Sequence, residues 1–349
     1  MLMKLGVGVF VLAIVQIFWI QPASGQAVTT CTVRVYCGMY SLIFAQCIPQ
    51  IPPGATDCSP IAFGLSCLVT LTGPQCSAPT NTCTKCSAKA PGAGLPINLT
   101  NGNTYIDEVD VKVPGLGGGL SLERVWNSTW PSRVSVYQTG MFGANWRSTY
   151  EERVFVTNVG ALTYMGYLQA DGSTWYFGGG GSSWTLVSPA NVSATLTQNG
   201  TSWTLAFKTG EQRTFDYSTG LLTSISDRNG NTTQLTYDGT NRLTTITDAA
   251  SRHLTFTYGN TSYPALVTAV GSDVGLSLSY VYDTSGRLTQ VTKPDTTTVN
   301  FAYNTQSLIS SVTDSQGKVL ETHTYDSQGR GLTSSRANGV EAITVSYPQ

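Results

Sequence analysis

A turn between two short strands recurs along the chain, and its clearest copy is Tyr282-Asp283-Thr284-Ser285-Gly286-Arg287-Leu288. The pattern returns at 237–243 and 325–330. In each copy the Asp can accept hydrogen bonds from the turn backbone, the Gly or Asn tolerates positive φ, and the Arg can pair with the Asp across a hairpin. The residues predicted to build these turns are Tyr237, Asp238, Arg242, Tyr282, Asp283, Gly286, Arg287, Tyr325, Asp326, Gly329 and Arg330.

Tyrosines continue this repeat along the C-terminal part of the chain. A fixed period of this size indicates stacked supersecondary units rather than one globular core. The aligned tyrosines, 20 to 24 residues apart, are Tyr217, Tyr237, Tyr258, Tyr282, Tyr303, Tyr325 and Tyr347.

The segment before each tyrosine alternates with a period of two, as in Leu278, Tyr280 and Tyr282. Period two predicts a half-buried strand whose aromatic side faces inward. The intervening residues are mostly Thr, Ser, Ala and Asn, which suit the wetter side of an antiparallel sheet. Two strands and two turns account for one period.

The pattern Y-D-x-x-G-R-L at this interval resembles the YD repeats of the Rhs family, which includes bacterial Rhs toxins, wall-associated proteins and animal teneurins. The segment before the repeats resembles the domain of unknown function that opens many bacterial Rhs proteins, and it does so at 97–103, 107–110, 120–128 and 142–147. The resemblance implies a long β-sheet that spirals into a hollow shell. In the toxins such a shell encloses a C-terminal effector, and in teneurins it presents an adhesive surface.

The sequence therefore predicts an all-β fold with an antiparallel YD-repeat β-sheet, part of a spiral shell, preceded by a small β-rich domain and a disulfide-rich N-terminal module. The predicted parts are a signal peptide at 1–25, a Cys-rich disulfide module at 26–90, the Rhs-associated N-terminal domain at 91–165, a connecting β segment at 166–210 and about seven YD-repeat registers at 211–349.

The N-terminal segment has the order of a secretory signal: Lys4, an apolar run from Leu5 to Ile20, and small residues around Ala23 and Gly25. An even number of cysteines confined to one short exported segment indicates disulfides, whose pairing the sequence does not choose. A zinc or redox role for the C-x-x-C pair at 83–86 lacks a second such pair or a nearby His. The disulfide candidates are Cys31, Cys37, Cys47, Cys58, Cys67, Cys76, Cys83 and Cys86.

Composition argues against two classes of function. Only 11% of residues are charged and the net charge is -1, which removes the basic patch that phosphate binding requires, so no nucleic-acid partner is expected. Two histidines leave little material for acid/base catalysis. His323 is on the inward face and is expected to be a hydrogen-bonded interior residue, whereas His253 is on the opposite face.

Two binding alternatives stay open. Asp238, Asp283 and Asp326 could bind calcium, as repeat aspartates do in some solenoids, although the Arg at +4 favours a turn and ion-pair role. The tryptophans before the repeats could stack on sugars, although large aromatic side chains usually fill cores. These tryptophans are Trp126, Trp130, Trp146, Trp175, Trp184 and Trp203.

We therefore expect an exported, non-catalytic structural scaffold of the Rhs/YD-repeat type, secreted or at the cell surface, without catalytic residues, cofactor or metal ligands. Its expected partners are a C-terminal effector, further repeats of the same shell, or surface polysaccharide, and no transmembrane span is expected after signal removal. One alternative is a cell-surface adhesin or carbohydrate-binding protein. The other is the N-terminal portion of a larger Rhs polymorphic toxin, although the Asp-Pro-x-Gly-Leu signature that closes such toxin shells is missing from this sequence.

Overall fold

The described part of the chain is built almost entirely from β-strands, which confirms the predicted all-β class. The computed structural model describes residues 30–38, 55–61, 64–72, 92–93, 97–159, 162–189, 192–336 and 339–347. Residues 97–150 contain two short 3-10 helices, at Leu116–Gly118 and Ser132–Tyr137. None of the described helices has the length and hydropathy of a membrane span.

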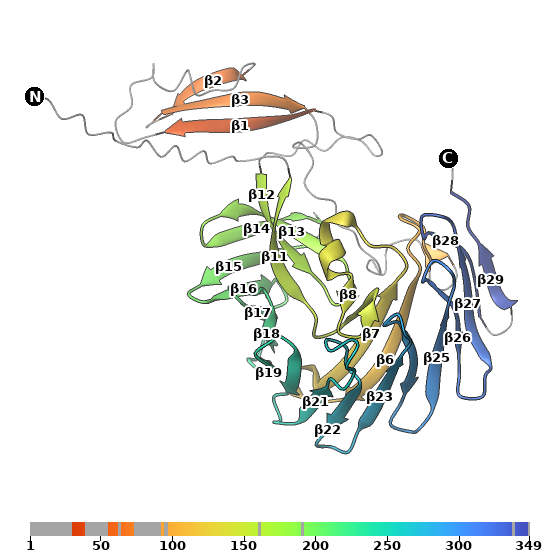
Figure 1. Ribbon diagram of the computed structural model, residues 1–349. Helices are drawn as coiled ribbons and strands as arrows, with labels where there is room; N and C mark the ends of the chain where they lie inside the picture. Colours follow the sequence, from red (N-terminus) through yellow and green to blue (C-terminus); the bar gives the residue numbers. More distant parts are fainter. Residues whose placement is uncertain are drawn as a thin grey trace, which may run out of the picture. The chain divides into compact units, whose positions relative to one another are not determined.

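One antiparallel sheet of 19 strands runs in chain order from β11 to β29 (Figure 1). Every strand therefore pairs with its neighbours in the sequence, as expected for a chain of hairpins. Its strands are β11 (Arg153–Val159), β12 (Leu162–Leu168), β13 (Thr174–Gly180), β14 (Ser183–Ser188), β15 (Ala194–Asn199), β16 (Ser202–Phe207), β17 (Gln212–Asp216), β18 (Leu222–Ser226), β19 (Thr232–Tyr237), β20 (Leu243–Thr247), β21 (His253–Thr257), β22 (Ala269–Ser272), β23 (Ser277–Tyr282), β24 (Leu288–Thr292), β25 (Thr298–Tyr303), β26 (Ile309–Thr313), β27 (Val319–Tyr325), β28 (Gly331–Arg336) and β29 (Val340–Thr344).

Shorter sheets precede it, and the described strands fall into two compact units, of which the first contains β1–β3. In that unit β3 lies between β1 and β2, and both pairings are antiparallel. In the second unit, β7 lies between β6 and β10. These strands are β1 (Thr30–Gly38), β2 (Ala55–Ile61), β3 (Gly64–Thr72), β4 (Gly92–Ala93), β5 (Ile97–Asn98), β6 (Tyr105–Val113), β7 (Leu120–Asn127), β8 (Thr139–Gly140), β9 (Gly143–Ala144) and β10 (Trp146–Ser148).

Several N-terminal predictions lie outside the described residues. The predicted signal peptide at 1–25 is one of them. Cys31 and Cys37 fall on β1, Cys58 on β2 and Cys67 on β3, but the description of these strands does not extend to their side chains. The disulfide module therefore stays a prediction, and the other candidates, Cys47, Cys76, Cys83 and Cys86, lie outside the described residues altogether.

The two faces of the long sheet differ as the alternation predicts. On β21, Leu254 and Phe256 are buried while Thr255 between them is exposed. On β23, Leu278 and Tyr280 are buried while Ser279 is exposed. One apolar face therefore continues from strand to strand, because neighbouring hairpins keep the same register of inward residues.

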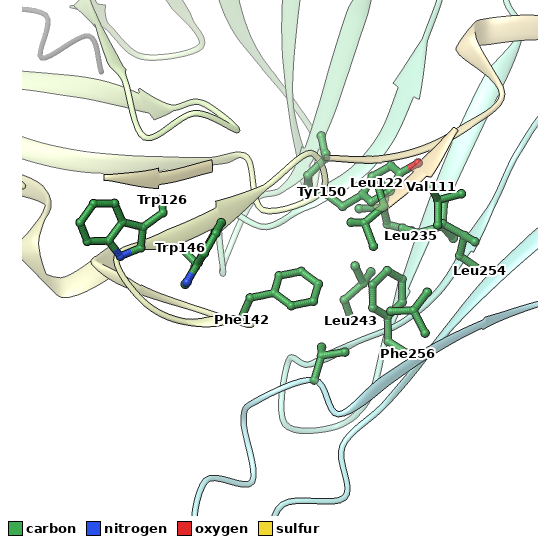
Figure 2. Close-up of a cluster of buried hydrophobic side chains, with 14 of the residues drawn as sticks. Val111, Leu122, Trp126, Phe142, Trp146, Tyr150, Leu235, Leu243, Leu254 and Phe256 are labelled. Carbon is green, nitrogen blue, oxygen red and sulfur yellow. The ribbon is translucent and has the colours of Figure 1, made fainter. Parts of the chain in front are cut away.

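Residues 97–150 cover this apolar face. In Figure 1, β6 and β7 lie inside the curve formed by the long sheet. Figure 2 shows Trp126, Trp146 and Phe142 from these residues in one cluster with Leu235 and Phe256 from the sheet. The domain before the repeats and the inner face of the repeats thus share a single hydrophobic core, which removes from water an apolar surface that the sheet alone would expose.

The first part of the long sheet closes back on itself. An isolated antiparallel bridge joins Arg153 at the start of β11 to Leu221 just before β18. The backbone N–H of Val154 donates to the carbonyl of Gly220 at 3.0 Å. Gly220 has φ +69°, and a Cβ there would overlap the Val154 carbonyl oxygen, so a glycine is required at this contact. Strands β11 to β18 therefore complete one turn of the sheet.

Candidate functional site

The repeat turn is held by the carboxylate of its aspartate. Asp283 Oδ1 accepts hydrogen bonds from the backbone N–H groups of Ser285 and Arg287, both at 2.9 Å. Its Oδ2 accepts from the Arg287 side chain, whose Nε and terminal nitrogen each lie 2.7 Å away. Gly286 has φ +73°, the left-handed conformation predicted for this position. The carboxylate thus fixes the backbone of the turn and the guanidinium together.

The same geometry recurs at the other predicted turns. Asp238 binds Arg242 at 2.8 Å and Asp326 binds Arg330 at 2.7 Å, with Asn241 and Gly329 at positive φ. Sequence reasoning missed a fourth pair, Asp248 and Arg252, whose side chains lie 2.6 Å apart. Its turn joins β20 to β21, at the opposite ends of the strands from the turn of Asp238. The spacing D-x-x-x-R was its signal, but no tyrosine precedes Asp248.

Each repeat tyrosine binds the backbone at or just before the start of the preceding strand in the sheet. The hydroxyl of Tyr282 donates to the carbonyl of Val267 at 2.7 Å. Five further tyrosines make the equivalent bond to a carbonyl 15 or 16 residues earlier, with distances of 2.5–2.8 Å. The six donors are Tyr237, Tyr258, Tyr282, Tyr303, Tyr325 and Tyr347.

The arginine of each of the three predicted turns, Arg242, Arg287 and Arg330, also lies over the tyrosine ring of the following repeat. The Arg287 guanidinium lies 4.8 Å from the centre of the Tyr303 ring, and Arg330 lies 4.2 Å from that of Tyr347. Such cation–π contacts add to the ion pair with the aspartate. One repeat is thus completed by side chains of the next.

Electrostatics keep these groups in the charge states that the contacts need. Burial raises the pKa of Tyr282, so its hydroxyl stays protonated and donates. Burial also raises the pKa of the Asp283 carboxyl, but hydrogen bonds from the backbone and side chain of Arg287 outweigh it and the net pKa is lowered. The carboxylate therefore stays ionised at neutral pH.

The predicted first register is wrong by two residues. The recurring bulge falls between Val281 and Tyr282 in one repeat and between Thr214 and Phe215 at the start of the series. Phe215 therefore takes the place of the repeat tyrosine. Tyr217 instead lies within the turn, where it is 50% exposed and stacks on Trp203 with ring centres 5.6 Å apart. A pattern of tyrosines alone cannot locate this position, because a phenylalanine fills the same inward place.

A buried ionic cluster joins residues 97–150 to the long sheet. Arg124 on β7 and Asp110 on β6 have fully buried side chains and are linked by two hydrogen bonds, one of 2.9 Å. The Tyr280 hydroxyl on β23 donates to the same carboxylate at 2.8 Å. Burial lowers and Asp110 raises the pKa of Arg124, and the net shift is upward. Arg124 thus stays charged, and its guanidinium lies 4.6 Å from the Trp146 ring.

Backbone contacts extend this junction along the sheet. The N–H of Gly331 on β28 donates to Gly102, and that of Val267 before β22 donates to Met141. At the other end, the Asn127 side chain donates to the Asp171 carbonyl. The residues before the repeats are therefore tied to early and late strands of the same sheet.

Both histidines lie on the faces expected for them, but His323 differs from its prediction in one respect. Its side chain is buried on β27, yet neither ring nitrogen has a hydrogen-bond partner in the described part of the chain. Its Nε2 lies 3.3 Å from Glu321 Oε2, an ion pair when the imidazole is protonated. His253 shares a hydrogen bond of 3.0 Å with Thr247 through Nδ1.

The repeat aspartates considered for calcium and the tryptophans considered for sugars contact other protein groups. Oδ1 and Oδ2 of each predicted repeat aspartate are engaged by the turn and its arginine, as in Asp238 and Asp326. Trp126, Trp146 and Trp184 are buried, as the core-filling interpretation predicts, and so is Trp203. Trp130 and Trp175 are half-buried.

Two family models match the chain in the predicted order. Residues 94–177 match the domain of unknown function DUF6531, and residues 215–260 match the RHS repeat. The first match spans the strands inside the curve and the first strands of the long sheet, and the second match lies within the long sheet. These two matches confirm the predicted resemblance to Rhs/YD-repeat proteins, with the DUF6531 domain before the repeats.

The relatives that this chain matches are much longer than the chain, which spans 6% of their length. A tRNA nuclease WapA of Bacillus subtilis is 31% identical over 148 residues, which are 42% of this chain and 6% of that relative. A tRNA3(Ser)-specific nuclease WapA of Bacillus spizizenii is 30% identical over the same shares. Among solved structures, TcdB2-TccC3-Cdc42 has 14% identity and a TM-score of 0.31, covering 66% of this chain and 14% of that one. The Photorhabdus luminescens Tc holotoxin pore has 14% identity and a TM-score of 0.30 over the same shares.

Proposed function

We propose that this chain is an exported, non-catalytic scaffold that forms part of a β-shell enclosing or displaying a partner. The observation that carries the proposal is the single ordered sheet from β11 to β29, closed at Gly220 and covered on its inner face by residues 97–150. These features supply a wall of paired strands, part of whose inner face is already covered by residues 97–150. The side chains at the repeat turns serve to hold the wall together, and we assign no catalytic step to them.

Export and a secreted or cell-surface location belong to the same proposal. The apolar run and small residues at 1–25 support cleavage of a signal peptide, and the eight cysteines at 31–86 suit an oxidising compartment. Thiol titration of the secreted product under denaturing conditions, with and without reductant, tests this part. Finding eight reactive thiols without reductant would contradict it.

A protection experiment on the native product tests the scaffold itself. An antibody against the repeat region recovers the product from the producing cells and their medium, and its mass is compared with 37.2 kDa. We expect a larger species whose additional part resists protease until urea unfolds the sheet. If the additional part is digested while residues 97–347 stay intact, the wall does not enclose it and display is the remaining role.

The N-terminal portion of a larger Rhs toxin is the second candidate. The observation that favours it is the similarity to proteins named as WapA tRNA nucleases, of which this chain spans 6%. In this case the proposed partner is an effector on the same polypeptide. The mass measurement separates this candidate from an independent scaffold, because a product slightly below 37.2 kDa carries no room for an effector.

A carbohydrate-binding role has one observation in its favour. Tyr217 is exposed in its turn and stacks on Trp203 with an interplanar angle of 23°. A flat, accessible ring can stack on the apolar face of a sugar. Tryptophan fluorescence during titration with soluble polysaccharides tests this role, with Tyr217→Ala as the control variant. A response that is the same in the variant and the original chain would contradict it.

A further inference from the structure

The turn at Asp216 lacks the arginine of the predicted repeat turns. Oδ1 of Asp216 accepts hydrogen bonds from the backbone N–H and hydroxyl groups of Ser218 and Thr219, at 2.7–3.0 Å. The residue four positions after the aspartate is Gly220, and a side chain there would meet the Val154 carbonyl at the closure of the sheet. This turn is therefore held by its carboxylate without a guanidinium.

The second oxygen of this carboxylate has no partner in the described part of the chain. All four donors bind Oδ1 of Asp216, and its Oδ2 forms no hydrogen bond or ion pair there. A guanidinium does reach this turn, because Arg153 donates to the Thr219 carbonyl at 2.8 Å. That guanidinium lies over the Tyr137 ring and makes no ion pair with Asp216. Hydrogen bonds from Ser218 and Thr219 lower the pKa of Asp216, so an unpaired negative charge remains at neutral pH.

An exposed aromatic ring follows this charge in the chain. Tyr217 is 50% exposed and stacks on Trp203. The predicted turns have small residues at the same position, namely Gly239, Thr284 and Ser327. The stack holds the Tyr217 ring in place and leaves half of its surface open, so the ring can receive a cation.

A carboxylate, a guanidinium and a tyrosine ring occur together at three other turns. Arg242, Arg287 and Arg330 each bind the aspartate of their own turn and lie 4.2–4.8 Å from the centre of a tyrosine ring. The turn of Asp216 offers a carboxylate oxygen and a ring, but no arginine. The recurrence of this combination within one sheet favours a guanidinium as the missing group.

We propose that Asp216 and Tyr217 form a docking site for an arginine side chain of a partner polypeptide. A guanidinium donates to the free Oδ2 and packs against the exposed ring, as the arginines of the other turns do. A neutral sugar would use the ring but leave the carboxylate charge unpaired, so the chemistry favours a cation over the carbohydrate considered above. A planar guanidinium suits a carboxylate beside a ring better than a lysine ammonium does. The site does not depend on the scaffold function.

An arginine tripeptide blocked at both ends tests the proposal on the full chain. The backbone amide NMR signals of Ser218 and Thr219 are followed as the tripeptide is added. We expect saturable shifts, and we expect the affinity to fall as salt is added, because exposed charges are screened. The same tripeptide with citrulline, which keeps the shape of the side chain without its charge, should give no saturable shift. This comparison uses the unaltered chain and is independent of any variant.

Two variants assign the binding to this carboxylate. Asp216→Asn removes the charge but keeps an acceptor for the turn, as Asn304 does when its Oδ1 accepts from Gln306 and Leu308. Asp295→Asn is the matched control, because Asp295 is an exposed turn carboxylate without an aromatic neighbour in the sequence. We expect Asp216→Asn to weaken binding by about fivefold, the factor that one exposed ion pair supplies, and Asp295→Asn to leave it unchanged.

Three results would overturn the assignment. The first is equal binding by the original chain and a folded Asp216→Asn variant, with folding checked by circular dichroism. The second is equal binding of the arginine and citrulline tripeptides, or of neither. The third is a response to soluble polysaccharide that requires Tyr217 and persists in Asp216→Asn, in a chain that does not bind the arginine tripeptide. That third result would identify a carbohydrate as the ligand of the ring.

Discussion

Removal of the Asp110 carboxylate should loosen the junction between the domain before the repeats and the sheet. Asp110→Ala leaves the buried Arg124 guanidinium without its counter-ion and the Tyr280 hydroxyl without its acceptor. Removing one partner of a buried ion pair costs about 3–5 kcal/mol, because the remaining charge stays buried and unpaired. We expect a loss of this size in the free energy of unfolding.

Urea unfolding followed by tryptophan fluorescence measures this loss, since Trp146 lies against Arg124. Lys293→Ala is the matched control, because it breaks a more accessible ion pair with Glu108 between the same two parts of the molecule. Exposed pairs contribute only about 0–1 kcal/mol. If Asp110→Ala destabilises the protein no more than Lys293→Ala, the buried cluster is not what holds the domain to the sheet.

Three further predictions concern the sheet itself. Tyr282→Ala should destabilise it by about 3–5 kcal/mol through lost core volume and a lost hydrogen bond, measured by thermal unfolding, and unchanged stability would argue against the inward position. Gly220→Ala should lower the Tm strongly, because the new Cβ meets the Val154 carbonyl at positive φ, whereas the open turn glycine Gly230 should tolerate alanine better. The pKa of Asp283 is lower in the folded chain than in the unfolded one. Its contribution to the free energy of unfolding is therefore present above about pH 4 and is lost as the pH falls through the folded pKa. The difference in stability between the original chain and Asp283→Asn, measured by urea unfolding, should narrow on acidification.

Local features of this fold could be predicted because local residues determine them. The D-x-x-G-R turn needs a carboxylate, a left-handed residue and an arginine within five positions, and all three are visible in Asp283, Gly286 and Arg287. The alternation that buries Leu278 and Tyr280 follows from strand geometry alone. A period of hairpins then leaves little choice of topology, since sequential strands pair.

Contacts between distant positions could not be predicted in the same way. The Tyr280 hydroxyl meets Asp110 across 170 positions, and no local pattern marks either residue for the other. The closure of the sheet at Gly220 depends on how far the strands twist before β11 and β18 meet, which the hydrophobic pattern does not encode. Phe215 was missed for a different reason, because its ring satisfies the inward position without the hydroxyl that the other repeats use.

The repeat turn explains why a chain with few charges can hold so long a sheet in one register. Within one repeat, Asp283 orients Arg287, and Arg287 then lies over Tyr303 of the next repeat. Tyr303 in turn donates to the Leu288 carbonyl, in the strand that follows the first turn. Each tyrosine therefore binds a strand that the preceding turn has positioned, and a slip of one residue would break the ion pair, the stacking contact and the hydroxyl bond together. Polar contacts at the ends of the strands thus fix the register together with the apolar face. Two independent sets of contacts suit a wall whose inner face must stay in place against residues 97–150.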